Sequence, residues 1–292
     1  MNITPVYENI STYTGLQNVH HTDHGDDWEL QEPPQFEPLW FEKFDRRWWL
    51  TFAREHWYLS VCASMVYIIA IFGLQTFMRN RPAFELKKAL FVWNAGLGIF
   101  SIIGFVRYVP EFMSVLSNGG VHNSLCRREG LNVPLAYWSL LFTLSKFVEL
   151  GDTVFIVLRK RPLVFLQWYH HAITLNAVWL MVPYLEPISR WYAFMNYGVH
   201  SLMYPYFALK AIDVHISRKF ANTITCTQLT QMVVGLLVNL YTIFVISAGG
   251  DCIRHPNSVK MFLTVYGSFT LLFGELLYKT MFAPSKKRSK ND

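Results

Sequence analysis

Long apolar runs separated by short polar connections dominate the sequence beyond residue 56. At 1.5 Å per helical residue, seven of these runs are long enough to cross the hydrocarbon core of a bilayer. The runs cover residues 57–78, 89–109, 133–150, 163–182, 188–209, 224–246 and 261–282. This pattern predicts an all-α, polytopic membrane protein in which seven transmembrane helices form one bundle.

The segments on either side of this bundle have a different pattern. Residues 1–56 begin polar and end in a stretch rich in Trp and Phe with interspersed charges, which is typical of an amphipathic helix at a membrane surface. Residues 1–50 lack the apolar core of a cleavable signal peptide. We therefore predict an N-terminal tail and interfacial segment at 1–56, a seven-helix domain at 57–282 and a basic tail at 283–292.

Charge then orients the bundle. The chain is 52% apolar and 16% charged, with a formal net charge of +6. An odd number of spans places the two termini on opposite sides, and most Lys and Arg residues fall in connections on the C-terminal side. By the positive-inside rule the C-terminus is cytosolic and the N-terminus lumenal. Membrane topology therefore explains the positive charge better than nucleic-acid binding does.

Two features on the predicted lumenal side fit an oxidising compartment. Asn2 and Asn9 each begin an N-x-Ser/Thr sequon, and both are expected to be glycosylation sites. Cys126 and Cys252 fall in two different lumenal connections, where a disulfide can persist. Spacing alone does not identify a pair, but their shared compartment leads us to expect a disulfide between them.

The fourth run carries an unusual polar stripe. Gln167, His170, His171 and Thr174 lie within one or two helical turns of each other and share a face. Such groups are expensive in lipid and usually face a bundle interior or a water-filled cavity. The alternative is that the histidines are structural and bond to neighbouring helices.

The end of the third run carries four more polar groups. Lys146, Glu149 and Thr153 share one helical face, and Asp152 lies one turn from Glu149. A snorkelling ion pair would explain Lys146 with Glu149. It does not explain the other two residues, so binding and structural roles both stay open here.

The fifth and sixth runs continue this pattern, whereas the first two carry few polar groups and are expected to be scaffold. Asn196, His200 and Tyr204 recur at intervals of four in the fifth run. Gln228 and Gln231 open the sixth, where hydrogen bonds across helices are the simpler explanation. Stripes on four helices predict one polar chamber that opens to the cytosol and has apolar walls toward the lumen. This shape suits a ligand with a charged head and a long apolar tail.

These motifs resemble the ELO/ELOVL family of very-long-chain fatty acid elongases, over residues 57–282. The resemblance rests on Lys146-x-x-Glu149-x-x-Asp152-Thr153, Gln167-x-x-His170-His171, Met195-Asn196-x-x-Val199-His200-x-x-Met203-Tyr204 and Thr225-x-x-Gln228-x-x-Gln231. It is closest to the branch that extends saturated and monounsaturated chains. It implies an endoplasmic reticulum enzyme that condenses long-chain acyl-CoA with malonyl-CoA in an acyl-CoA tunnel. It further implies no cofactor, and partner enzymes that reduce, dehydrate and reduce the product again.

The resemblance also implies roles for individual residues. His170 and His200 would lie nearest the acyl transfer, with His171 as general base or orienting partner. Substrate-binding roles would fall to Lys146, Glu149, Asp152, Thr153, Gln167, Asn196, Tyr204, Gln228 and Gln231. One departure is Gln167, since the family box usually begins with His; some elongases, notably those acting on polyunsaturated chains, also have Gln there.

Two other protein classes remain alternatives at this stage. A di-iron lipid desaturase or hydroxylase also uses His-x-x-His-His boxes but needs several of them. Only three of the ten histidines lie within predicted spans here, so we expect no metal site. A seven-helix receptor would fit the topology, but not a His-His pair facing Lys, Glu, Asp and Gln side chains.

Overall fold

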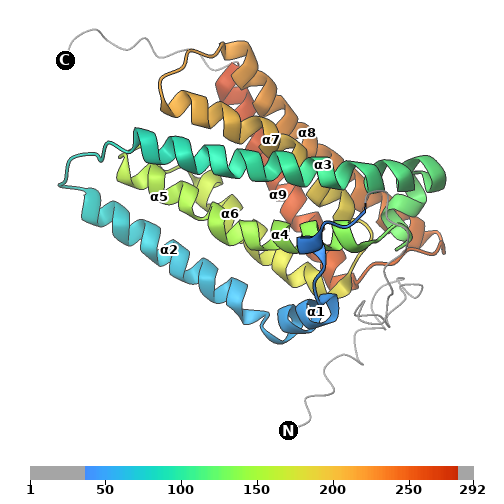
Figure 1. The fold of residues 1–292 in the computed structure, drawn as a ribbon. Coiled ribbons are helices and arrows are strands. Elements are labelled where there is room, and N and C mark those ends of the chain that lie inside the picture. The colour runs from blue at the N-terminus through green and yellow to red at the C-terminus, as the bar shows by residue number, and fades with distance from the viewer. Residues whose placement is uncertain (1–36, 282–292) are drawn as a thin grey trace.

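The computed structural model describes residues 37–281, which form helices and connections without a strand among them. The predicted sequons at Asn2 and Asn9 and the basic tail at 283–292 lie outside these residues. Two short 3-10 helices, η1 (Trp40–Glu42) and η2 (Val182–Tyr184), accompany the α-helices. The α-helices are α1 (Arg46–Glu55), α2 (Tyr58–Met78), α3 (Lys87–Cys126), α4 (Val133–Glu149), α5 (Gly151–Leu158), α6 (Phe165–Met181), α7 (Ser189–Ala211), α8 (Arg218–Ser247) and α9 (Pro256–Met281) (Figure 1).

Within the described residues, each of the seven predicted runs falls on helix. Four helices in this part of the chain are long and apolar enough to cross a membrane by themselves: α2, α3, α8 and α9. The other runs correspond to α4 with α5, to α6 and to α7. These carry most of the polar stripes, and α4 and α6 have only 17 residues each. The all-helical membrane fold is therefore confirmed, while the count of seven spans stays a prediction.

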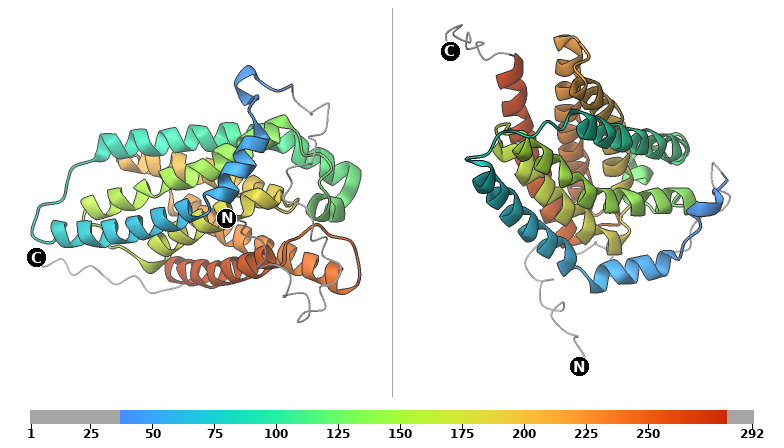
Figure 2. Two further views of the ribbon diagram at one scale, coloured as in Figure 1. Left: turned by 90° about the horizontal axis from the view of Figure 1, so that it is seen from below. Right: turned by 60° about the vertical axis from the view of Figure 1, so that its left-hand side comes forward.

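The helices pack as a ring around the polar stripes. Contacts run from α3 to α7, on to α8, α9, α6 and α4, and back to α3, while α2 packs outside against α5 and α6. Figure 2 shows the bundle from two further sides, with α1 crossing its helices at a steep angle. The polar helices α4 to α7 thus lie among apolar ones, as a buried polar chamber requires.

Helix α3 extends well beyond the predicted second run. It contains Pro110 and continues to Cys126, over 40 residues in all. The helical path is interrupted at Gly120, whose φ of 70° is readily adopted only by glycine. The turn at Gly120 redirects the last residues of α3, and Cys126 ends the helix.

Cys126 is joined by a disulfide to Cys252, which precedes α9. The Ile253 N–H also donates to the Cys126 carbonyl at 3.1 Å. The disulfide closes a loop of 126 residues between the ends of α3 and α8.

In native, unreduced protein we expect neither Cys126 nor Cys252 to be alkylated, and Cys126→Ser or Cys252→Ser to lose about 2–5 kcal/mol of stability. Mass spectrometry after alkylation, with and without reductant, tests the bond; labelling of both residues without reductant would contradict it.

Helix α1 has the character of an interfacial segment. Asp45 caps it by accepting from the Trp48 N–H at 2.9 Å. Trp49 and Ala53 are buried against Trp179 of α6, while the Trp48 side chain is exposed. One face is therefore packed on the bundle, and the other presents the kind of aromatic surface found at membrane interfaces.

Glu42 fastens the segment before α1 to the bundle. It accepts a bidentate pair of bonds from Arg107 of α3, at 2.8 and 2.6 Å. The Trp138 indole and the Leu39 N–H also donate to it, at 2.7 and 2.8 Å. Burial alone would raise the pKa of Glu42, but the bonds from Arg107, Leu39 and Trp138 together lower that pKa below its ordinary value. The carboxylate therefore stays ionised and holds η1 in place.

Candidate functional site

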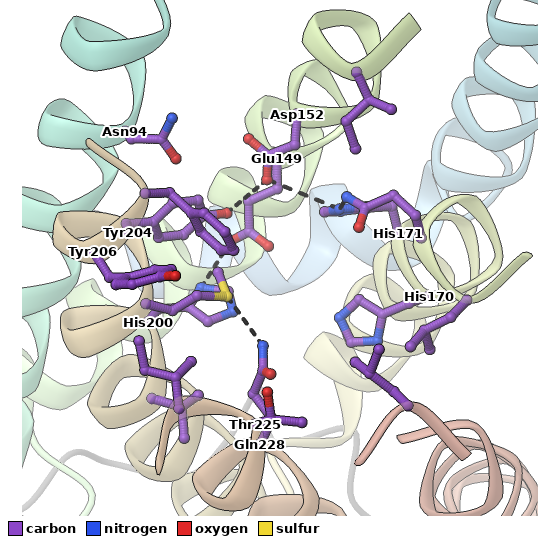
Figure 3. Close-up of a pocket in the computed structure, with 18 of the residues that line it drawn as sticks. Asn94, Glu149, Asp152, His170, His171, His200, Tyr204, Tyr206, Thr225 and Gln228 are labelled. Carbon is purple, nitrogen blue, oxygen red and sulfur yellow. Dashed lines mark hydrogen bonds and ion pairs between the residues drawn. The ribbon is translucent and has the colours of Figure 1, made fainter. Parts of the chain in front are cut away.

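A cavity of about 650 Å³ lies where the polar stripes meet. Its walls come from α3, α4, α5, α6, α7, α8 and α9. In Figure 3, His170 and His171 point into it from α6, His200 and Tyr204 from α7, and Asp152 from α5. All but two of the predicted site residues line it: Glu149, Asp152, Gln167, His170, His171, Asn196, His200, Tyr204, Gln228 and Gln231.

Lys146, one of the two exceptions, lies directly behind the cavity wall. Its buried ammonium donates to Glu149 at 2.7 Å and to the side-chain oxygen of Asn196 at 2.8 Å. The same ammonium lies 4.2 Å above the Phe142 ring. Lys146 therefore positions two cavity residues and is not among the residues that line the cavity, and its contact with substrate stays a prediction.

Thr153, the other exception, faces away from the cavity. Its hydroxyl is 2.6 Å from that of Tyr67 on α2, and the residue is fully buried. Thr153 instead joins α5 to α2.

The bond to Lys146 fixes the orientation of Asn196 and, through it, the protonation of His200. An ammonium can only donate, so the Asn196 oxygen faces Lys146 and its NH₂ group faces His200. That NH₂ group lies 3.1 Å from Nε2 of His200, which must accept. His200 is then neutral and carries its proton on Nδ1, which lies 3.8 Å from a Glu149 oxygen.

Asp152 is held by two donors at once. The Trp93 indole donates to one carboxylate oxygen at 2.7 Å, and the Tyr204 hydroxyl donates to the other at 2.9 Å. Nε2 of His171 lies 3.9 Å from this second oxygen. The carboxylate is therefore fixed beside the histidine pair.

The two box histidines have different surroundings. The Gln167 amide nitrogen lies 2.8 Å from Nε2 of His171, one helical turn away. The side chain of His170 makes no hydrogen bond within the described part of the chain, and its Nδ1 is buried without a partner. Its ring packs on Phe269 and Phe273 of α9, with ring centres 4.6 and 5.7 Å away. His170 thus presents an imidazole with no competing hydrogen bond to the cavity.

Several cavity residues were not assigned from the sequence. Arg159, Arg161 and Lys210 lie at the ends of α5 and α7 and add basic groups to the cavity wall. Asn94 lines the cavity from α3, and Trp93 on the same helix donates to the cavity residue Asp152, so the expectation that this helix is only scaffold was wrong. Asn94 is a polar residue inside an otherwise apolar run, and this was the available signal that α3 contributes to the site. The signal was weak, because a single Asn can bond to its own helix, as the Asn94 amide does to the Leu90 carbonyl.

Comparison with known proteins identifies the family. The sequence model of the ELO family, described as the GNS1/SUR4 family, matches residues 52–289. The chain belongs to this family. Very long chain fatty acid elongase 6 of Drosophila melanogaster is 38% identical, covering 87% of this chain and 81% of that protein. The human protein of the same name is 37% identical, covering 86% of this chain and 95% of its own length. Putative fatty acid elongase 4 of Caenorhabditis elegans is 32% identical over 100% of this chain and 99% of its own length.

Family membership confirms the predicted resemblance and favours an elongase over the receptor and desaturase alternatives. Within residues 37–281, no three His, Cys, Asp or Glu side chains are grouped as a metal ion would require. The cavity residues can instead do acid–base, nucleophilic and hydrogen-bonding chemistry.

Gln167 allows a direct test of the altered box. Gln167→His is expected to keep or raise activity, because His at this position is the common state of the family and can also bond to His171. Gln167→Ala removes the bond at 2.8 Å and is expected to lower activity about tenfold. Initial rates of chain extension measure both variants. A Gln167→Ala variant as active as wild type would mean that Gln167 only fills space and has no role in the reaction.

Proposed function

We propose that this protein is the condensing enzyme of long-chain fatty acid elongation. Acyl-CoA and malonyl-CoA would react to give 3-oxoacyl-CoA, CoA and CO₂, with both thioesters as substrates and no cofactor. The observation that carries the proposal is the unbonded His170 in a cavity whose other histidines are already held by Gln167 and Asn196.

The first half-reaction uses His170 as nucleophile. A neutral imidazole nitrogen attacks the acyl thioester carbonyl, the C–S bond breaks, and CoA leaves as the thiol after taking up a proton. The products of this step are acyl-imidazole and free CoA. That proton comes from the N–H of the acylated His170 ring, which leaves the acyl-imidazole neutral. His171, beside Asp152, is placed to return a proton to this ring in the second half-reaction.

The second half-reaction consumes malonyl-CoA. Loss of CO₂ leaves an enolate of acetyl-CoA, whose carbon attacks the acyl-imidazole carbonyl while the imidazole departs. The enolate oxygen needs positioned donors, and the amides of Gln228 and Gln231 across the cavity can supply them. The 3-oxoacyl-CoA then leaves, and His170 is free again.

The cavity walls suit such substrates. Arg159, Arg161 and Lys210 offer charges for CoA phosphates. Ile156, Val199 and Phe273 are among the apolar residues that face an acyl chain. The positive-inside rule places the basic end in the cytosol, where CoA thioesters are found, and the N-terminus in the lumen. We propose the endoplasmic reticulum membrane as the location, with a ketoacyl reductase, a dehydratase and an enoyl reductase as partners.

Isolated membranes given long-chain acyl-CoA and radiolabelled malonyl-CoA test this function. The expected product is a 3-oxoacyl chain two carbons longer than the acyl donor, carrying the label. Membranes that lack the protein serve as the control. Absence of acyl-CoA-dependent incorporation by correctly inserted protein would refute the proposal, and an array of acyl chain lengths would identify the preferred donor.

A further inference from the structure

We propose that Trp93 is a positioning residue for the reaction and acts by fixing the Asp152 carboxylate toward His171. This inference rests on the proposed condensing activity. Its starting point is the 2.7 Å bond from the Trp93 indole N–H to one Asp152 oxygen. Trp93 belongs to the helix expected to be scaffold, and it does not itself line the cavity.

The carboxylate is clamped between two donors on different helices. Trp93 on α3 holds one oxygen and Tyr204 on α7 holds the other, at 2.9 Å. The oxygen bonded to Tyr204 is also the one that lies 3.9 Å from Nε2 of His171. Loss of the indole donor would let the carboxylate turn about its side-chain bonds, so its distance from His171 would no longer be fixed.

The local sequence is shaped around the indole. A Cβ atom at Gly151 would come within 2.6 Å of the Trp93 ring, so only glycine permits this approach. The ring also packs at a tilt on Phe155, with centres 5.5 Å apart. Gly151 and Asp152 are adjacent in the first turn of α5, so one turn of helix provides both the space for the indole and the acceptor for its N–H.

The outer side of Trp93 is open. The ring lines a shallow groove on the outside of the bundle, with Lys88, Ala89, Val92, Gly96, Leu97 and Val148. Trp93 therefore forms a thin wall between this groove and the bonded carboxylate. A change at its Nε1 atom can alter the site without leaving a hole in the hydrophobic core.

The decisive experiment replaces Trp93 by 3-benzothienylalanine, which keeps the shape of the ring but has sulfur in place of N–H. We expect kcat for condensation to fall about tenfold to a hundredfold, as for loss of a bond to a charged group, while KM for acyl-CoA stays within about twofold. The control is the same replacement at Trp191, which does not line the cavity and whose indole donates to the Ser124 hydroxyl at 3.1 Å. It is expected to leave both constants unchanged.

A second pair of variants uses natural residues. Gly151→Ala should displace the indole and reproduce the loss of kcat, whereas Gly96→Ala, whose added Cβ meets no atom within 4 Å, should not. An isostere at position 93 with wild-type kcat would overturn the inference, as would a rise in KM with kcat intact. Inactive wild-type protein would instead count against the condensing function, so the two failures are distinguishable.

Discussion

His170→Ala is expected to lower condensation by about a thousandfold or more, because it removes the proposed nucleophile of the first half-reaction. The structure singles out this histidine, since Nε2 of His200 accepts from Asn196 and that of His171 lies against Gln167. With acyl-CoA alone, wild-type protein should release CoA and gain the mass of one acyl group, and the kinetics should be ping-pong. Intact-protein mass spectrometry and quantification of free CoA measure both effects.

Alanine variants of the other histidines test which of them take part in the reaction. His200→Ala should also abolish turnover, whereas His171→Ala should be severe yet still release CoA if its role is proton transfer in the second half-reaction. His215→Ala, on an exposed connection, is the matched control and should behave as wild type. Active enzyme that releases no CoA with acyl-CoA alone would contradict the acyl-enzyme. Direct attack by the malonyl enolate would then be favoured, with the histidines as acid, base and oxyanion groups.

The helices and most of the cavity wall could be predicted because both depend on local spacing. Asn196, His200 and Tyr204 recur every four residues, so any helix that contains them places them on one face. The same reasoning located Gln167 and His171, which bond one turn apart in the structure. A stripe of polar groups in an apolar run then required a common buried space.

What could not be predicted depends on contacts between distant helices. Lys146 reaches Asn196, 50 positions away, and Trp93 reaches Asp152, 59 positions away. Spacing along the chain says nothing about which stripe faces which neighbour. The division between α4 and α5 near Leu150 is equally invisible in the spacing of these residues, as is the contact of Thr153 with Tyr67 on α2.

A buried polar network lies at the end of the bundle opposite the basic cavity residues. It too is made of contacts between distant segments, which spacing along the chain does not reveal. Arg254 is 1% exposed and donates to Glu186 at 3.0 Å, to Thr242 at 2.7 Å and to Asn239 at 3.1 Å. Glu186 also accepts from Ser258 at 2.7 Å. In the sequence, Arg254 is a basic residue in the connection between the sixth and seventh apolar runs, with nothing to mark its partners. In the structure it fastens the segment after Cys252 onto α8 and the connection before α7.

Arg254→Met is therefore expected to cost about 3–5 kcal/mol, because it leaves the Glu186 carboxylate buried without its cation. For a chain of this size the melting temperature in detergent should fall by about 10 °C. The double variant Arg254→Met with Glu186→Leu should recover part of this loss, since no unpaired charge remains. Lys87→Met breaks an ion pair with Asp213 whose side chains are 59% and 70% exposed, and it should cause no measurable change. An Arg254→Met variant with the melting temperature of wild type would show that the network contributes nothing to stability.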